Sequence, residues 1–204
     1  MDTIQFIMLE LRKKYKSGSA AEILREAILT GDIPEGISIT QNEIADSLGT
    51  SRMPVREALI SLEYQGLITR GNNQHVLVNA INYEYIRTVF NDMAMIEIES
   101  LKQMTNEKII MLTECEEQIN FHRMICEFTH APLRKKMLEI FTEIYFAFVI
   151  ERSDNVNQIQ NAFMNLKQAV KNMNHEVIRS CYEEYSEILS DELMNIRERR
   201  MKHA

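Results

Sequence analysis

The chain has 204 residues, of which 45% are hydrophobic and 26% charged, an ordinary composition for a soluble globular protein. No apolar run approaches the roughly 18 residues that span a bilayer, and residues 1–15 lack the pattern of a signal peptide. The net charge of −7 excludes a uniformly basic nucleic-acid binder, so phosphate contacts require a local positive cluster. The three cysteines show no paired spacing, which favours reduced thiols and a cytoplasmic location.

Residues 19–30 predict an amphipathic helix that Gly31 ends. Thr40 and Glu43 then form a capping-box pattern at the start of a second helix, which ends at Gly49. In a third helix, which runs to Gly66, we expect Ser51 to be the N-cap and Pro54 to lie in the first turn, where a missing N–H costs little.

Two short apolar runs, residues 67–69 and 76–78, predict strands joined by the loop at 70–75. The order of helix, helix, turn, helix and hairpin is that of a winged helix-turn-helix, which we assign to residues 1–79. Past Pro132 the chain contains no Gly or Pro, so residues 80–204 predict an all-helical domain and the fold class is mostly α. We expect its helices near residues 83–104, 106–129, 132–152, 156–173 and 175–200.

The start of the third helix carries the residues that suit DNA reading. Arg52 and Arg56 are four residues apart and share one helix face. The planar fork of arginine matches guanine O6 and N7 or a phosphate, and Ser51 at the helix N-terminus favours a phosphate oxygen. The second helix opens with Gln41 and Asn42, which can touch the DNA backbone. The alternative is a solvated helix face whose arginines pair with Glu57 or Glu63.

The predicted wing loop is polar and can reach a minor groove or phosphates. Its candidate contact residues are Arg70, Gly71, Asn72, Gln74 and His75.

The segment "SRMPVREAL" followed by "LEYQGLI" resembles the signature of the GntR family of bacterial regulators, and the resemblance covers about residues 20–78. It implies DNA contacts at Ser51, Arg52, Pro54 and Arg56 and in the wing from 71 to 75. Asn42 departs from relatives that place an arginine there. The wing lacks the usual second glycine, since Gln74 and His75 stand in its place.

The helical remainder resembles the FCD-type effector domain of the FadR-like subfamily. Glu97 stands where that domain carries a glutamate, and Phe121 and His122 match its Phe-His pair, with a shortened stretch between them. Met93 stands where an arginine often holds a carboxylate ligand.

Many relatives bind a metal through an Asp and three His. Here the corresponding positions are Gln118, His122, Phe163 and Tyr185. A single imidazole does not make a zinc site, so the resemblance implies a lost metal site and no cofactor. His122 is left as the candidate effector contact. His122 and Cys126 also fall on one helix face with His130, but a core histidine and a buried thiol are the simpler interpretation.

No pattern of catalytic residues appears, so we expect no enzyme. The sequence predicts a homodimeric, ligand-responsive repressor that binds an operator in double-stranded DNA. One alternative keeps DNA binding but limits the helical domain to dimerisation without a ligand. Another alternative is a helical small-molecule or metal-binding protein whose winged helix serves as a protein-contact module.

Overall fold

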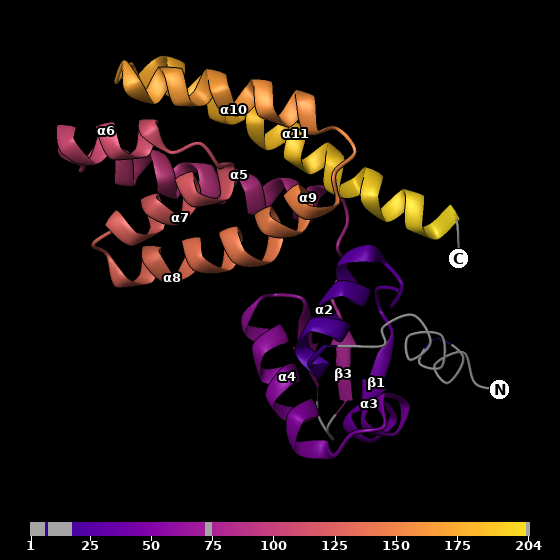
Figure 1. Cartoon of the computed structure of the whole chain (residues 1–204). Coiled ribbons are helices and arrows are strands. Elements are labelled where there is room, and N and C mark those ends of the chain that lie inside the picture. Colours follow the sequence, from indigo (N-terminus) through magenta and orange to yellow (C-terminus); the bar gives the residue numbers. More distant parts are fainter. Residues whose placement is uncertain (1–6, 8–17, 72–74, 203–204) are drawn as a thin grey trace. The chain divides into compact units, whose positions relative to one another are not determined.

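The chain forms two compact units in a computed structural model that describes residues 7, 18–71 and 75–202. Unit 1 comprises Met1–Ile81 with Arg197–Ala204, and unit 2 comprises Asn82–Ile196 (Figure 1). The predicted mostly helical fold, with an N-terminal winged helix and a helical remainder, is confirmed. None of the described helices combines the length and the apolar character that a bilayer crossing requires.

Unit 1 is built from helices and one small sheet. Within its described residues these elements are α2 (Ala20–Thr30), β1 (Ser38–Thr40), α3 (Gln41–Leu48), α4 (Arg52–Tyr64), β2 (Ile68–Arg70) and β3 (His75–Val78). Helix α2 packs against α4, and α4 against α3, around a core that includes Leu24, Val55 and Leu62. All three of these side chains are at most 2% exposed, so apolar burial holds the three helices together.

Local sequence signals set the ends of the first two of these helices. Ser19 and Glu22 form a capping box at α2, and Thr40 and Glu43 form the predicted one at α3. The left-handed φ values of +82° at Gly31 and +64° at Gly49 end the two helices, and glycine adopts such values without steric cost.

The sheet has a strand that the sequence did not predict. Its order is β1-β3-β2, and β3 pairs antiparallel with both neighbours. The predicted hairpin is present as β2 and β3, each beginning or ending one residue from its expected place. Strand β1 was missed because three residues are too few to show an alternating pattern, and it exists through its pairing with β3.

Unit 2 is helical throughout its described residues. Its elements are α5 (Tyr83–Leu101), α6 (Asn106–Glu114), α7 (Gln118–Phe128), α8 (Pro132–Ile140), the π-helix η2 (Phe141–Phe146), α9 (Ala147–Arg152), α10 (Val156–Lys171) and α11 (His175–Lys202), whose last residues belong to unit 1. Figure 1 shows α10 and α11 side by side over α5. Helix α5 also packs against α7 and α8, and α6 packs against α10.

The single helix expected over residues 106–129 is wrong. The chain breaks between α6 and α7, where Cys115 is extended with ψ of 129°. Lys167 of α10 donates a 2.6 Å hydrogen bond to the Cys115 carbonyl, which satisfies an acceptor that the helix no longer uses. Glu114, Glu116 and Glu117 crowd negative charge at the break, which disfavours a continuous helix there.

The expected helix over residues 132–152 is continuous but not uniform. Its middle, from Phe141 to Phe146, is a π-helix that turns four buried side chains inward: Thr142, Ile144, Tyr145 and Phe146. The wider turn is a tertiary packing effect that helical periodicity does not reveal.

Candidate nucleic-acid interface

The start of α4 presents an outward face. Val55, Ala58 and Leu59 lie on the buried side of α4, so the opposite side is available to solvent. Arg52 and Arg56 are both exposed on that side. Because four residues make about one helical turn, the two side chains leave α4 in nearly the same direction.

Neither guanidinium is engaged elsewhere in the described part of the chain. No ion pair or hydrogen bond joins Arg52 or Arg56 to Glu57 or Glu63, so the alternative of a self-paired helix face receives no support from the contacts. Both forks are therefore able to donate their hydrogen bonds to a ligand outside the unit.

Ser51 differs from its predicted role. It occupies the N-cap position of α4, but its hydroxyl makes no capping hydrogen bond. Pro54, the third residue of α4, supplies no N–H, so one of the usual first-turn partners of a cap is absent. The exposed Ser51 hydroxyl and the first amides of α4 thus remain able to bind an anion, as helix N-termini do.

Gln41 and Asn42 open α3, as expected. Gln41 is half-buried and Asn42 is exposed. The capping box that orients this helix start is strong: the Thr40 amide and hydroxyl each donate a 2.7 Å hydrogen bond to Glu43. These bonds lower the pKa of the Glu43 carboxyl.

The described residues of the wing present less unpaired positive charge than the sequence indicates. Arg70 donates to Glu63 of α4 at 2.9 Å, so its positive charge is largely offset. His75 lies within 3.2 Å of the Ser38 hydroxyl, across the β1–β3 pair, and its carbonyl accepts from the Gly71 amide. The predicted contacts Asn72 and Gln74 lie outside the described residues.

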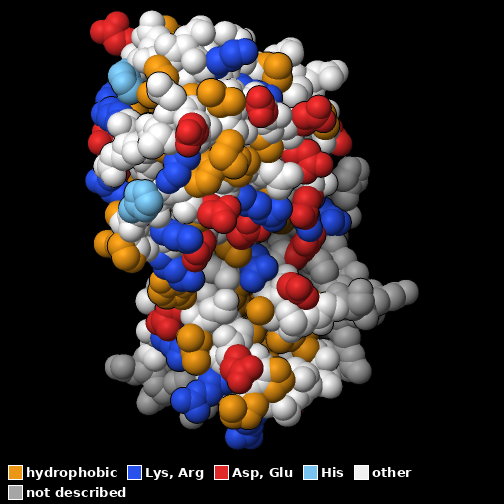
Figure 2. All heavy atoms as spheres, turned by 60° about the vertical axis from the view of Figure 1, so that its left-hand side comes forward, with side chains coloured by type: hydrophobic (Ala, Val, Ile, Leu, Met, Phe, Trp, Pro, Cys, Tyr) orange, Lys and Arg blue, Asp and Glu red, His pale blue; other side chains and the backbone are white. Residues whose placement is uncertain are grey.

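Met53 is a further exposed residue of this face that the sequence analysis did not single out. Its side chain is 60% exposed and lies between the positions of the two arginines along α4. A thymine methyl group is the base feature that an apolar side chain recognises. The helical spacing could have identified Met53, because residues 52, 53 and 56 share one side of a helix. Figure 2 shows positive and hydrophobic side chains together at the lower end of unit 1.

The predicted effector contact, His122, lies in the interior of unit 2. Its Nδ1 atom is 2.9 and 3.0 Å from the two carboxylate oxygens of Glu97, and the Tyr182 hydroxyl donates to the same carboxylate at 2.9 Å. All three side chains are at most 2% exposed. Burial, and then the negative charge of Glu97, raise the pKa of Tyr182, so its hydroxyl stays a donor.

The positions matched to the family's metal ligands do converge around His122. Its ring stacks on Tyr185 at 5.8 Å between centroids, and Phe121 joins it to Phe163 through two edge contacts. The Tyr185 hydroxyl donates to Gln118 at 2.7 Å.

These residues do not fit a zinc ion. Phe163 offers no ligand, the Gln118 amide is engaged by Tyr185 and Gln160, and His122 is the one imidazole among them. No group of three or more His, Cys, Asp or Glu side chains suited to a metal occurs within the described ranges. The Nε2 atom of His122 is nevertheless buried without a partner among the described residues, beside a cavity of about 10 Å³.

Residues 16–78 match the family described as bacterial regulatory proteins, gntR family. This stretch contains all of the described winged helix and its outward arginines. Unit 1 is therefore a winged-helix domain, the class that its element order defines, and its sequence is similar to that of the gntR family.

Curated relatives match in the same region. An uncharacterised HTH-type transcriptional regulator of Mycobacterium tuberculosis is 43% identical over 56 residues, which are 28% of this chain and 22% of that protein. An uncharacterised HTH-type regulator from an unstable DNA locus of Streptomyces ambofaciens is 47% identical over 45 residues, 22% of this chain and 19% of that protein. The proteins that this chain resembles are transcriptional regulators and not enzymes.

Two solved structures share the fold along most of the chain. Lar, which controls the expression of the Listeria monocytogenes agr system, superposes with a TM-score of 0.58 at 16% identity, covering 86% of this chain and 95% of its own. E. coli McbR/YncC gives 0.56 at 18% identity, covering 96% and 99%. At these identities the likeness establishes the fold.

Proposed function

We propose that this chain is a sequence-specific DNA-binding transcription regulator that acts in the cytoplasm as a homodimer. The observation that carries the proposal is the pair Arg52 and Arg56, exposed and without an ion pair in the described part of unit 1, at the start of α4. A gntR-type winged helix gives this pair the position of a recognition helix N-terminus.

The proposed reading uses α4 for bases and its surroundings for phosphates. Each arginine donates two hydrogen bonds to a guanine edge or a phosphate, while Ser51 and Gln41 contact the DNA backbone. Two copies present two such helices to successive major grooves of a pseudo-palindromic operator, with half-sites roughly 34–36 Å apart or a multiple of that spacing. This arrangement explains how an acidic chain binds DNA, because only the contact surface needs positive charge.

The finer proposal is a repressor of the FadR-like subfamily with a shortened FCD-type domain in unit 2. It would release or engage its operator when a small molecule binds, without a metal. The residue proposed for the effector is His122, because its Nε2 is a buried hydrogen-bonding atom with no partner among the described residues. A ligand that donates or accepts there, and prefers one arrangement of the dimer, would shift operator binding.

A second candidate keeps DNA binding and dispenses with the effector. The cavity beside His122 measures about 10 Å³, which is the space for a single water molecule. Phe121, Phe146 and Tyr185 fill the surrounding volume with aromatic rings. In this second function unit 2 only dimerises.

The test of DNA binding is selection of genomic fragments by the purified protein at two salt concentrations. We expect a palindrome, and affinity for it should fall as salt rises. In the Arg52→Ala, Arg56→Ala double variant, binding should weaken by about 1–3 kcal/mol for each arginine that reads a base.

Lys171→Ala, which removes an exposed charge from α10 of unit 2, is the control and should bind as the parent does. Full operator affinity in the double variant would overturn the proposal and favour a protein-contact role for the winged helix.

Operator binding with and without a small-molecule cell extract separates the two candidates. The effector proposal expects a change in affinity that His122→Ala abolishes. The dimerisation proposal expects no change in either protein.

A further inference from the structure

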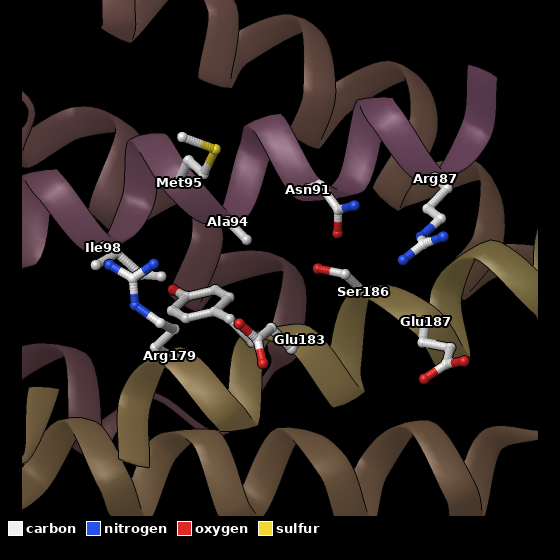
Figure 3. Close-up of a pocket in the computed structure, with 10 residues that line it drawn as sticks. Arg87, Asn91, Ala94, Met95, Ile98, Arg179, Glu183, Ser186 and Glu187 are labelled. Atoms are coloured by element: carbon white, nitrogen blue, oxygen red, sulfur yellow. The ribbon is translucent and has the colours of Figure 1, made fainter. Parts of the chain in front are cut away.

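A groove of about 420 Å³ runs between α5 and α11 on the surface of unit 2 (Figure 3). Its residues recur at helical spacing on both helices, so each helix contributes one continuous stripe: Arg87, Asn91, Ala94, Met95 and Ile98 from α5, and Arg179, Tyr182, Glu183, Ser186 and Glu187 from α11. The groove is therefore formed by two long helices, and no loop residue lines it.

Small residues make the groove deep. Ala94 and Ser186 lie at its floor, and the Ser186 hydroxyl donates to the Phe90 carbonyl of α5 at 3.3 Å. That bond marks a close approach of the two helices, which small side chains permit. Larger side chains stand on both sides, so the floor forms a hole bordered by projecting groups (Figure 3).

Met95 is a large apolar side chain at the edge of this hole. It is 65% exposed, although it belongs to a helix whose other face is well buried. A flexible, polarizable methionine beside an open groove is typical of a contact surface. The projecting Met95 side chain and the hole lie on the same face, and association with an identical surface requires both.

The charges of the groove are balanced. Arg87 and Arg179 provide two positive groups, and Glu183 and Glu187 provide two negative ones. Within the part of the chain that the structure describes, none of the four forms an ion pair within 4 Å. The whole chain carries a net charge of −7, so two copies repel each other overall, and a locally neutral face such as this one adds no further repulsion where they meet.

We propose that the α5–α11 groove is the surface through which two copies of this chain associate. The inference rests on the proposed function, because it names the surface that forms the regulator's dimer. About a two-fold axis, Met95 of each copy enters the hole of the other, and the arginines of each copy meet the glutamates of the other. The occupant is a second copy, because the groove contains both members of each contact. It has the methionine and the hole that receives it, and the arginines and the glutamates that pair with them.

The first test compares single charge insertions by sedimentation equilibrium. Met95→Glu places a charge in the contact and should weaken dimerisation at least about tenfold. Met111→Glu is the matched control, because Met111 is a 52% exposed methionine of α6 in the same unit, away from the groove. It should dimerise as the parent chain does. Equal dimerisation of both variants would overturn the inference.

The second test inverts the rim charges. One variant, Arg87→Glu with Arg179→Glu, has an all-negative rim, and the other, Glu183→Arg with Glu187→Arg, has an all-positive rim. Each alone should be monomeric, and an equimolar mixture should form heterodimers, because repulsion within each variant becomes attraction between them. Heterodimer formation also proves that both variants are folded.

The outcomes separate this inference from DNA binding. If all variants sediment as the parent chain does, the groove serves another occupant, such as a small molecule, and the inference fails while operator selection can still succeed. If the rim variants behave as expected but the parent chain selects no DNA, the dimer surface stands and the proposed function fails.

Discussion

The imidazole of His122 and the carboxylate of Glu97 lie 2.9 Å apart in the interior of unit 2, joining α7 to α5. Glu97 is completely buried and also accepts from the Tyr182 hydroxyl of α11. One carboxylate therefore ties three helices together, and the energetic consequence is that its removal strands two buried donors.

Glu97→Ala should destabilise unit 2 strongly. A buried hydrogen-bonding group that loses its partner costs about 1–3 kcal/mol, and Glu97→Ala leaves two such groups, on His122 and Tyr182, buried without their acceptor. Urea unfolding followed by circular dichroism measures the change. Glu107→Ala, which removes an exposed carboxylate from α6, is the control and should stay within about 0.5 kcal/mol of the parent chain. A small effect of Glu97→Ala would contradict the stabilising role of the network.

Glu43→Ala should destabilise unit 1 in a pH-dependent way. Hydrogen bonds from Thr40 lower the pKa of Glu43 below its ordinary value of 4.5, so the folded state favours the carboxylate. This contribution is present above that ordinary value and is lost as the pH falls through the lowered one. The stability difference between Glu43→Ala and the parent chain should therefore be larger at pH 7 than at pH 3.

Asp46→Ala, on the exposed side of the same helix, serves as the comparison for that experiment. Thr40→Ala should cost about 1 kcal/mol through the lost cap. Thermal unfolding that is identical for Thr40→Ala and the parent chain would argue against the capping box as a source of stability.

Glu63→Gln should strengthen DNA binding. Glu63 holds Arg70 at 2.9 Å, so the neutral amide frees a positive group of the wing and removes a negative one near it. We expect an affinity gain that is greatest at low salt, measured by fluorescence anisotropy with operator DNA. Glu107→Gln makes the same charge change in unit 2 and should have a smaller effect. An unchanged or weaker affinity in Glu63→Gln would show that Arg70 takes no part in binding.

Cys126 should resist alkylation in the folded protein. Burial, followed by the negative charge of Glu139, raises the pKa of its thiol to about 11. Since the thiolate is the reactive form, labelling with iodoacetamide at pH 8 should reach Cys126 far more slowly than the half-buried Cys115, and the rate should climb about tenfold per pH unit below pH 11. Mass spectrometry resolves the two sites. Comparable native rates would refute the prediction, and urea-unfolded protein provides the reference for full reactivity.

The sequence predicted the winged helix well because its signals are local. The capping box at Thr40, the glycine at 49 and the apolar stripe of α4 each act within a few residues. Strand β1 was missed because its pairing partner β3 is distant in the sequence, with His75 lying opposite Thr40, 35 residues away, and because its three residues show no period of their own. The break after α6 also depends on a distant group, the ammonium of Lys167.

The candidate sites also differ in whether they depend on local spacing or on contacts between distant residues. Spacing alone placed Arg52 and Arg56 on one exposed face, whereas the bond from Tyr182 to Glu97 joins residues 85 positions apart. The resemblance to a known domain drew attention to Glu97 and His122, but no pattern predicted Tyr182. The groove between α5 and α11 could likewise not be predicted from the sequence, because its prediction requires knowing which two helices are neighbours.

Thr40 is both the last residue of β1 and the N-cap of α3. Strand β1 and helix α3 are thus joined without a single intervening residue, so an insertion or deletion between 38 and 43 would shift strand pairing and helix start together. Under the proposed function, changes of operator preference are accordingly easiest through substitutions on the outer side of α4, at constant chain length. Variants in which the junction between β1 and α3 is lengthened or shortened should therefore misfold and should not gain a new binding specificity.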